Sequence, residues 1–259
     1  MANDYPDFSS LDFPKTLVLY GECSNPLTAL ETISIPPRET SYELSSSYAV
    51  LSPSSPGLRF SSSGWLGIST RQMLDAQSTE ELFQICRERI INRTSQFSVL
   101  LRLFLESYFD FLHSQIEKNK NKLEPENVED EIFNYKDWIF SAWLPLPQAR
   151  ILLPPKFMDN KPSFAEIDLA FWIEGQLIGV VIDGGETPIK SRKKKLDYLV
   201  EKHPQLWVIK VPRDKLEEDT FPIDLFPNSF SYFWRTLTLP HGPFTPKELI
   251  NKRWNSDGE

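Results

Sequence analysis

Two aspartates at the ends of neighbouring apolar runs are the residues whose types and spacing best suit chemistry. The stretch AEIDLAFWIEGQLIGVVIDGGE, residues 165–186, carries Asp168 in the first run and Asp183 at the end of the second. Because side chains alternate along a strand, Glu166 and Asp168 share one face, as do Val181 and Asp183. If the runs pair through the EGQ turn, the acids lie roughly opposite each other. Mg²⁺ is commonly held by one or two carboxylates with waters and substrate phosphates, so the spacing permits a metal site. A polar edge on an ordinary hairpin is the alternative.

A run of basic residues follows the second aspartate. The stretch KSRKKK opens an expected helix and holds the densest positive charge in the chain: Lys190, Arg192, Lys193, Lys194 and Lys195. The first turn of a helix also offers unpaired backbone amides, which bind phosphate well. We therefore expect these five side chains to contact a nucleic-acid backbone, with a solvated helix face as the alternative. The paired glycines of DGGE would let a ligand approach the strand end closely.

The acids and the basic run belong to the most regular part of the sequence, residues 163–211. Its apolar runs predict a strand, a tight turn and a second strand. A helix from about Ser191 to His203 follows, and then the strand QLWVIKV. The predicted order is β-β-α-β.

Three helices are expected before this segment. The sequence STEE supplies an N-cap at Ser78 with acids in the first turn, and apolar residues follow at helical spacing. A second helix begins near Ser95 and is apolar on most sides, which predicts a central, largely buried position. Its polar residues form one stripe: Arg102, Glu106, Asp110 and His113. The sequence EIFNYKDWIFSAW, residues 131–143, suggests a third helix that ends before Pro145.

Changes in composition divide the chain into four regions. They are a Ser/Pro-rich strand-and-loop region (1–77), a helical segment packing on the core (78–143), the β-β-α-β core with C-terminal packing elements (144–240) and a polar tail (241–259). Together they predict an α+β (or α/β) fold in which a mixed sheet is flanked by helices. The N-terminal region is expected to pack against this sheet or to form a separate unit.

Composition and charge exclude several classes of protein. The net charge of −8 over 259 residues gives no global attraction to nucleic acid or to an anionic membrane, so any such contact needs a local patch. Cys23 and Cys86 lack CxxC spacing, which supports neither a disulfide framework nor a cysteine zinc site. The first residues lack the basic start and apolar core typical of a secretory signal, and no uncharged apolar run approaches the roughly 18 residues needed to span a bilayer. We therefore expect a soluble, cytoplasmic protein without membrane contact.

Other chemistries lack their motifs. The three histidines show no metal-ligand spacing, and the sequence has no Walker loop, GxGxxG or GxSxG. Five tryptophans sit in apolar contexts and are expected in the core rather than on a stacking surface: Trp138, Trp143, Trp172, Trp207 and Trp234. Cofactor-dependent enzymes are therefore not supported.

The β-β-α-β segment resembles the core of the PD-(D/E)XK nuclease superfamily, particularly its branch related to very-short-patch-repair endonucleases. In that branch a VDF strand is followed by a strand ending IE-x-DGG and, after a helix, by a strand like VLR. Here EIDLAF, VVIDGG and WVIK occupy the corresponding places, over about a fifth of the chain. The resemblance implies a restriction-endonuclease-like fold and metal-dependent cleavage of DNA.

Some residues of this chain match the family's motif, and others depart from it. Asp168 matches the first metal-binding acid, and Asp183 matches the aspartate before the glycines. The family's glutamate falls on Val181, and the lysine of the ExK spacing falls on Gly185. The histidine that follows the glycines in the family is also absent.

Two arrangements could supply the missing groups. In the first, Asp183 is the second metal ligand, and Lys190, Lys193 or Lys194 reaches back from the helix to place a positive charge near the attacking water. In the second, Glu106 on the polar stripe joins as a further metal ligand, as a helical glutamate does in some members of the superfamily. A helix-face ion pair with Arg102 is the alternative for Glu106.

The chemistry implied is hydrolysis of phosphodiester bonds assisted by Mg²⁺ or Mn²⁺. Loss of an acid at Val181 leaves fewer anionic ligands. The alternative is therefore a catalytically inactive nuclease-fold protein that binds nucleic acid or a protein partner. A third hypothesis is a scaffold or interaction protein in which the β-β-α-β pattern is coincidental.

Overall fold

The computed structural model of the 259-residue chain describes fourteen stretches and single positions. They are residues 16–21, 42–44, 47–52, 55, 57–60, 62, 78–96, 98–120, 135–153, 163–173, 175–184, 189–202, 206–217 and 220–231. Within helices and strands, a few side chains, among them those of Lys190, Arg192 and Lys193, lie outside this description. Two strand-like runs of the Ser/Pro-rich strand-and-loop region, LETISI and GWLGIS, also lie outside the described residues.

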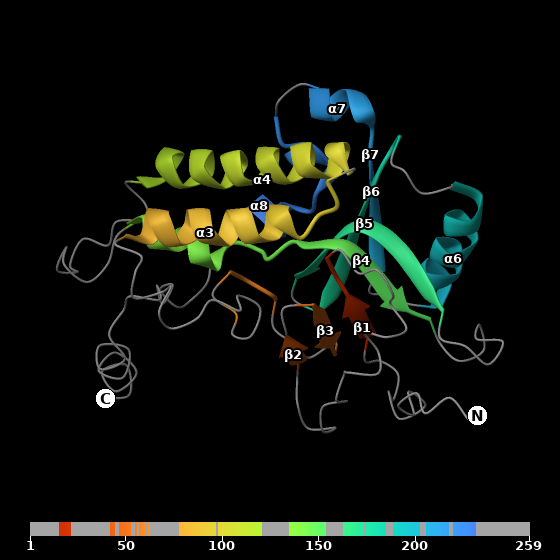
Figure 1. The fold of residues 1–259 in the computed structure, drawn as a ribbon. Coiled ribbons are helices and arrows are strands. Elements are labelled where there is room, and N and C mark those ends of the chain that lie inside the picture. Colours follow the sequence, from red (N-terminus) through yellow and green to blue (C-terminus); the bar gives the residue numbers. More distant parts are fainter. Residues whose placement is uncertain are drawn as a thin grey trace.

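The described residues form an α+β fold around one mixed sheet of seven strands (Figure 1). The strands are β1 (Thr16–Leu19), β2 (Tyr42–Leu44), β3 (Tyr48–Leu51), β4 (Leu146–Leu152), β5 (Phe164–Ile173), β6 (Gln176–Ile182) and β7 (Leu206–Val211). Their order across the sheet is β2-β3-β1-β4-β5-β6-β7. Neighbouring strands are antiparallel except β6 and β7, which are parallel. The predicted mixed sheet is confirmed.

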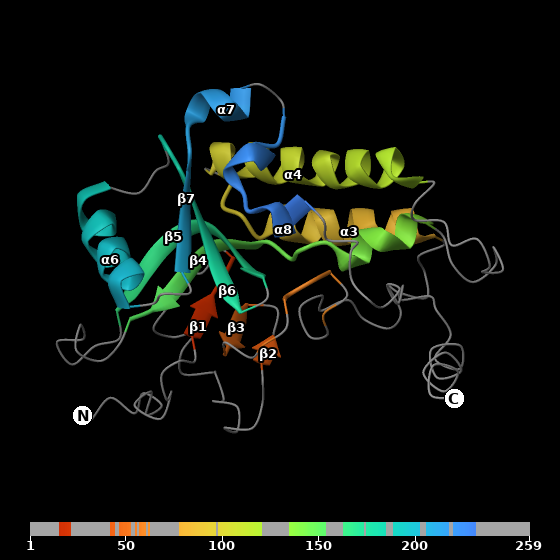
Figure 2. The same cartoon turned by 180° about the vertical axis from the view of Figure 1, so that it is seen from behind.

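Within the described residues, helices flank the sheet on both sides (Figures 1 and 2). They are α3 (Thr79–Asn92), α4 (Val99–Lys118), α6 (Ile189–Lys202), α7 (Arg213–Glu217) and α8 (Asn228–Ser231), with two 3₁₀ helices, η2 (Tyr135–Ser141) and η4 (Ile223–Leu225). Helices α3 and α4 run side by side on one flank, and α6 stands on the opposite flank (Figures 1 and 2). Among the helices in the described ranges, none is long and apolar enough to cross a membrane.

The N-terminal strands are continuous with the main sheet. Strand β1 lies between β3 and β4, and Val18 of β1 pairs with Ile151 of β4. All four residues of β1 are buried. Its place inside the sheet lets its backbone groups pair with β3 on one edge and with β4 on the other. These strands therefore neither form a separate unit nor pack on a face of the sheet; they extend it.

The β-β-α-β order is confirmed over the segment where the sequence predicts it. Strands β5 and β6 form a hairpin whose turn contains Gly175 at φ 84°. Positive φ suits glycine because it has no Cβ. Helix α6 then crosses over to β7, which pairs in parallel with β6 and brings Val211 beside Ile182. The helix begins and ends within two residues of its predicted bounds.

Two of the three helices predicted before the β-β-α-β segment are present as α-helices. Ser78 caps α3 by accepting a hydrogen bond from the Glu81 N–H at 3.1 Å. Helix α4 begins at Val99, a turn later than the predicted start. The third predicted helix is instead the 3₁₀ helix η2. Its centre is the buried run Trp138–Phe140, and aromatic and β-branched residues lose rotamer freedom in an α-helix.

An aromatic core joins α4, β5 and the C-terminal segment. Phe171 of β5 is fully buried, and its ring lies 5.4 Å from that of Tyr108 on α4 and 5.0 Å from that of Phe230 on α8. Offset and edge-to-face contacts at these distances are favourable. The described residues after β7 therefore close the core, as expected for C-terminal packing elements.

Three of the four tryptophans that the structure describes are buried. Trp138, Trp143 and Trp172 are each less than 7% exposed, as expected for core residues. Trp207 is 50% exposed, so its predicted place in the core is wrong. The reason is that β7 is the last strand of the sheet and has no neighbour on its outer side within the described residues. Trp234 lies outside the described residues.

Candidate functional site

Asp168 is anchored where β5 and β6 stop pairing. The register of the two strands ends at the pair Leu169 and Val180. One residue further, Asp168 Oδ2 accepts a hydrogen bond from the Ile182 N–H at 2.7 Å. The side chain thus takes the place of a backbone acceptor on the neighbouring strand. Its half-buried carboxylate is held against the backbone of the residue immediately before Asp183.

The sheet is irregular on the other side of Asp168 as well. The β4–β5 strand pairs before and after this position place Asp168 opposite Gln148 of β4. Gln148 has φ 49°. This left-handed conformation is uncommon for a residue other than glycine, and such strain persists where the surroundings enforce it. The Gln148 side chain accepts a hydrogen bond from the Ser95 N–H at 3.2 Å and lies 3.4 Å from Ser98 Oγ. The start of α4 is thereby tied to the sheet beside Asp168.

Asp183 lies at the exposed end of β6. Its N–H donates a hydrogen bond to the Val211 carbonyl at 2.9 Å, so β6 and β7 stay together up to this residue. Gly184 follows at φ 86°. A Cβ built on Gly184 would lie 3.6 Å from Leu100 Cδ1 and 3.8 Å from Arg213 Cδ. The strand end therefore lies close to the first turns of α4 and α7.

A lysine that the sequence did not single out lies beside this strand end. In the parallel register, Lys210 of β7 is the partner of Val181, so the two side chains point to the same face of the sheet. Val181 is half-buried and packs against the core, whereas Lys210 is exposed. The signal that could have found Lys210 is the final residue of WVIK, because a parallel crossover sets it next to the last residues of VVID.

The charges at the strand end are not paired with each other. Among the described residues, neither the Asp183 carboxylate nor the Lys210 ammonium has a hydrogen-bond or ion-pair partner. On α6, Lys194 is exposed and Lys195 is half-buried. The helical backbone under the whole basic run is present, and contact between its side chains and a ligand stays a prediction.

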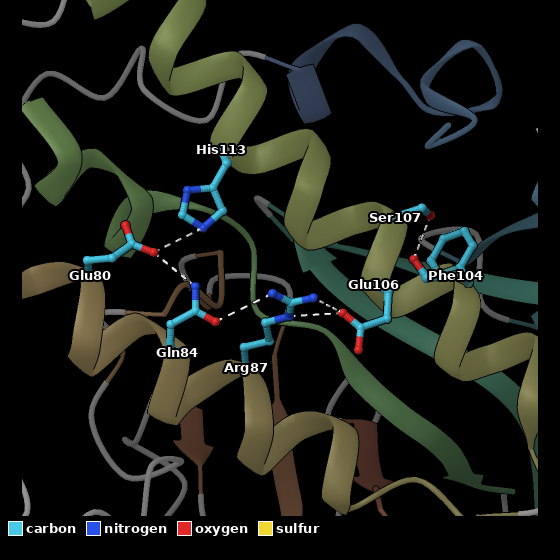
Figure 3. Close-up of polar contacts among 7 residues, drawn as sticks. All are labelled: Glu80, Gln84, Arg87, Phe104, Glu106, Ser107 and His113. Carbon is cyan, nitrogen blue, oxygen red and sulfur yellow. Dashed lines mark hydrogen bonds and ion pairs between the residues drawn. The ribbon is translucent and has the colours of Figure 1, made fainter. Parts of the chain in front are cut away.

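Glu106 is engaged by a residue of α3. Its Oε2 accepts a hydrogen bond from Arg87 Nε at 2.9 Å and also from Arg87 Nη2, as Figure 3 shows. The expected ion pair with Arg102 on the same helix is therefore wrong. The same network continues along α3 through Gln84 and Glu80, and Glu80 Oε1 lies 3.6 Å from Nε2 of His113 on α4. The carboxylate of Glu106 thus joins the two helices.

The available donors limit the kind of metal site that these residues could form. Among the described residues, which include Asp168, Asp183 and Glu106, there is no group of three or more His, Cys, Asp or Glu side chains arranged to hold a metal ion. Asp168 and Asp183 each carry hard carboxylate oxygens, and joint binding of a metal ion by these two residues stays a prediction. Such a donor set fits Mg²⁺ or Mn²⁺ whose remaining ligands are water and substrate phosphate.

Comparisons with known proteins give no assignment for this chain. No protein-family model matches it, and no significant match is found among curated proteins or solved structures. The candidate site therefore has to be interpreted from its own residues.

Proposed function

We propose that this protein hydrolyses phosphodiester bonds in DNA with the help of a divalent metal ion held by Asp168 and Asp183. The observation that supports this most is the hydrogen bond from the Ile182 N–H to Asp168 Oδ2. This bond holds the Asp168 carboxylate beside the backbone of Ile182, and Asp183 is the next residue in the chain. The resemblance of VVIDGG and its neighbouring strands to the very-short-patch-repair branch supplies the reaction class.

Both aspartates would be ligands of the metal ion. Asp168 is oriented by the backbone amide of Ile182, and an ionised carboxylate can accept several bonds at once, which suits it to a metal ligand. Asp183 presents an exposed carboxylate at the strand end. A bound Mg²⁺ or Mn²⁺ would polarise the scissile phosphate and lower the pKa of a coordinated water. Hydrolysis forms a phosphorus–oxygen bond to water and breaks the bond to the sugar oxygen, which leaves with a proton.

The substrate contact would come from the basic run of α6, because the chain as a whole is acidic. Lys194 is exposed, which suits a phosphate contact. Each phosphate neutralised releases counterions, so binding should weaken steeply as salt rises.

Cleavage of supercoiled plasmid DNA with Mg²⁺ or Mn²⁺ tests the proposal. We expect nicked and linear products from the natural protein and none with EDTA. The variant Asp183→Asn should lose about 100-fold or more in rate, because it removes a charged ligand. The control is Asp110→Asn, which removes an exposed acid on α4 and should cleave normally. Equal cleavage rates for Asp183→Asn and the natural protein would contradict the proposal. Failure of the natural protein to cleave DNA with either metal would contradict it as well.

A second function is favoured by one specific observation. Val181 packs against the core where the family has a glutamate, so the metal would have one ligand fewer. A protein of this kind could bind DNA, or a protein partner, without cutting DNA. Fluorescence anisotropy with a labelled duplex would then show salt-dependent binding without turnover. Simultaneous neutralisation of Lys193, Lys194 and Lys195 should weaken that binding, and an unchanged affinity would contradict it.

A further inference from the structure

The carboxyl ends of β6 and β7 lie at the same edge of the sheet. The two strands are parallel, and the Asp183 N–H donates to the Val211 carbonyl at 2.9 Å. Lys210 therefore stands one strand away from Val181, about 4.8 Å between backbones, on the face that Val181 and Asp183 share. Ligands of open sheets with parallel strands commonly bind beyond such carboxyl ends.

Arg213 approaches the same strand end from the first residue of α7. It is exposed, and its Cδ lies 3.8 Å from the position that a Cβ of Gly184 would occupy. Its aliphatic stem therefore runs beside the Gly184 backbone. Lys210 and Arg213 thus bring two cations to the residue pair Asp183–Gly184 from the neighbouring strand and from the helix after it.

The valine that replaces the family's glutamate changes what Lys210 can do. Opposite charges at paired positions of neighbouring strands attract, so an acid at position 181 would engage Lys210 as a cross-strand partner. Val181 cannot do so. Among the described residues, Lys210 has no ion pair. Its ammonium group is available for an anion from outside the protein.

A phosphate group that approaches Asp168 and Asp183 needs nearby cations, because two carboxylates repel it. An ammonium group neutralises it as a point charge, whereas a guanidinium can donate two parallel hydrogen bonds to its oxygens. The lysine position of the family's ExK motif holds glycine in this chain. Lys210 and Arg213 are the described cations that the strand register and the Gly184 contact bring to this end.

We infer that Lys210 and Arg213 form a phosphate clamp that holds the DNA phosphate at the Asp168–Asp183 site. This inference rests on the proposed function and adds the residues that contact the reacting group. It also gives the DNA a path across the carboxyl ends of β6 and β7.

Binding in the absence of cleavage gives the first test of the clamp. A labelled 20-base-pair duplex is titrated with protein in Ca²⁺ buffer at several salt concentrations, with anisotropy as the readout. Lys210→Met and Arg213→Met should each weaken binding about 5- to 10-fold and reduce the salt slope by about 1, as loss of one phosphate contact does. Lys118→Met, which removes an exposed lysine at the far end of α4, is the charge-matched control and should bind normally. Unchanged affinity and slope in both clamp variants would overturn the inference.

Cleavage at saturating DNA separates the clamp from the proposed hydrolysis. Lys210→Met should lower kcat about 100-fold, and Lys210→Arg should recover part of the loss because it keeps the charge. If the natural protein cuts DNA and both clamp variants bind and cut equally well, the clamp is wrong and the hydrolytic function stands. If the natural protein never cuts DNA but the clamp variants lose binding, the phosphate contact stands and hydrolysis is wrong.

Discussion

Two regions of the molecule carry similar acidic and basic residues and use them differently. Between α3 and α4, polar side chains meet one another in a continuous network: Glu80, Gln84, Arg87, Glu106 and His113 (Figure 3). At the carboxyl ends of β6 and β7, Asp183 and Lys210 face solvent and, among the described residues, have no side-chain partner.

The difference teaches that the surroundings of a carboxylate, rather than its spacing in sequence, decide its role. Glu106 and Asp183 both follow apolar stretches and both suit a metal ligand on sequence grounds. Glu106 already has a cation on the facing helix, so its charge is satisfied inside the protein. Asp183 has a backbone fixed by β7 and a carboxylate that remains available. The first arrangement joins helices, and the second is suited to binding.

The largest expected effect lies in the aromatic core that β5 forms with α4 and α8. Phe171→Ala should lower the free energy of unfolding by about 3–5 kcal/mol, because it removes a fully buried ring and leaves a cavity. Urea denaturation followed by circular dichroism measures the loss. Val99→Ala on α4, where the side chain is 60% exposed, is the control and should change stability by less than about 0.5 kcal/mol. Similar losses in the two variants would mean that β5 is not packed as described.

A smaller effect should distinguish the two aspartates of the site. Asp168→Ala should cost about 1–3 kcal/mol, because the Ile182 N–H loses its acceptor in a half-buried place. Asp183→Ala should stay within about 0.5 kcal/mol, because its carboxylate is exposed. Both variants should lose cleavage. Equal stability in the two would show that the Asp168 hydrogen bond does not anchor the strand end.

Glu106→Gln gives a smaller loss and tests the comparison directly. The ion pair with Arg87 is partly exposed, so its removal should cost no more than about 1 kcal/mol. Plasmid cleavage should remain at the natural rate. A folded Glu106→Gln protein that no longer cuts DNA would instead make Glu106 part of the metal site.

The smallest effect concerns the thiol of α3. Burial raises the pKa of the Cys86 thiol from near 9 to about 12. The stabilisation that comes from burying the neutral Cys86 thiol is therefore complete below pH 9 and is lost as the pH rises from about 9 towards 12. At pH 8 the thiol should resist iodoacetamide in the native protein and react quickly in urea. Peptide mass spectrometry separates it from Cys23, and rapid native labelling of Cys86 would contradict the packing of α3.

Local patterns predict the parts of the fold that depend on neighbouring residues. The hairpin of β5 and β6, helix α6 and strand β7 follow from apolar runs and a short turn. The place of β1 between β3 and β4 depends on residues more than one hundred positions apart, which no local pattern encodes. Pro147 also argues against a central strand, because proline has no N–H to donate. It is tolerated here, and its carbonyl accepts a hydrogen bond from the Gly21 N–H at 2.7 Å.

The candidate site likewise has features that local sequence patterns predict and features that they do not. The sequence predicts that one tight turn joins the strands of Asp168 and Asp183, and that hairpin is present. Lys210 depends on the parallel register, and Arg213 depends on the approach of α7 to Gly184. The partner of Glu106 could not be predicted either, since it lies on another helix 19 residues away.

Mapping the metal by iron-dependent cleavage of the protein chain tests the central claim most directly. Fe²⁺ replaces Mg²⁺, and ascorbate with peroxide generates radicals that cut the backbone close to the bound ion. We predict fragments that end near Asp168 and near Asp183, suppressed by excess Mg²⁺ and absent in Asp183→Asn. Cuts confined to the neighbourhood of Glu106, or no iron-dependent cut at either aspartate, would contradict a metal site at the strand end.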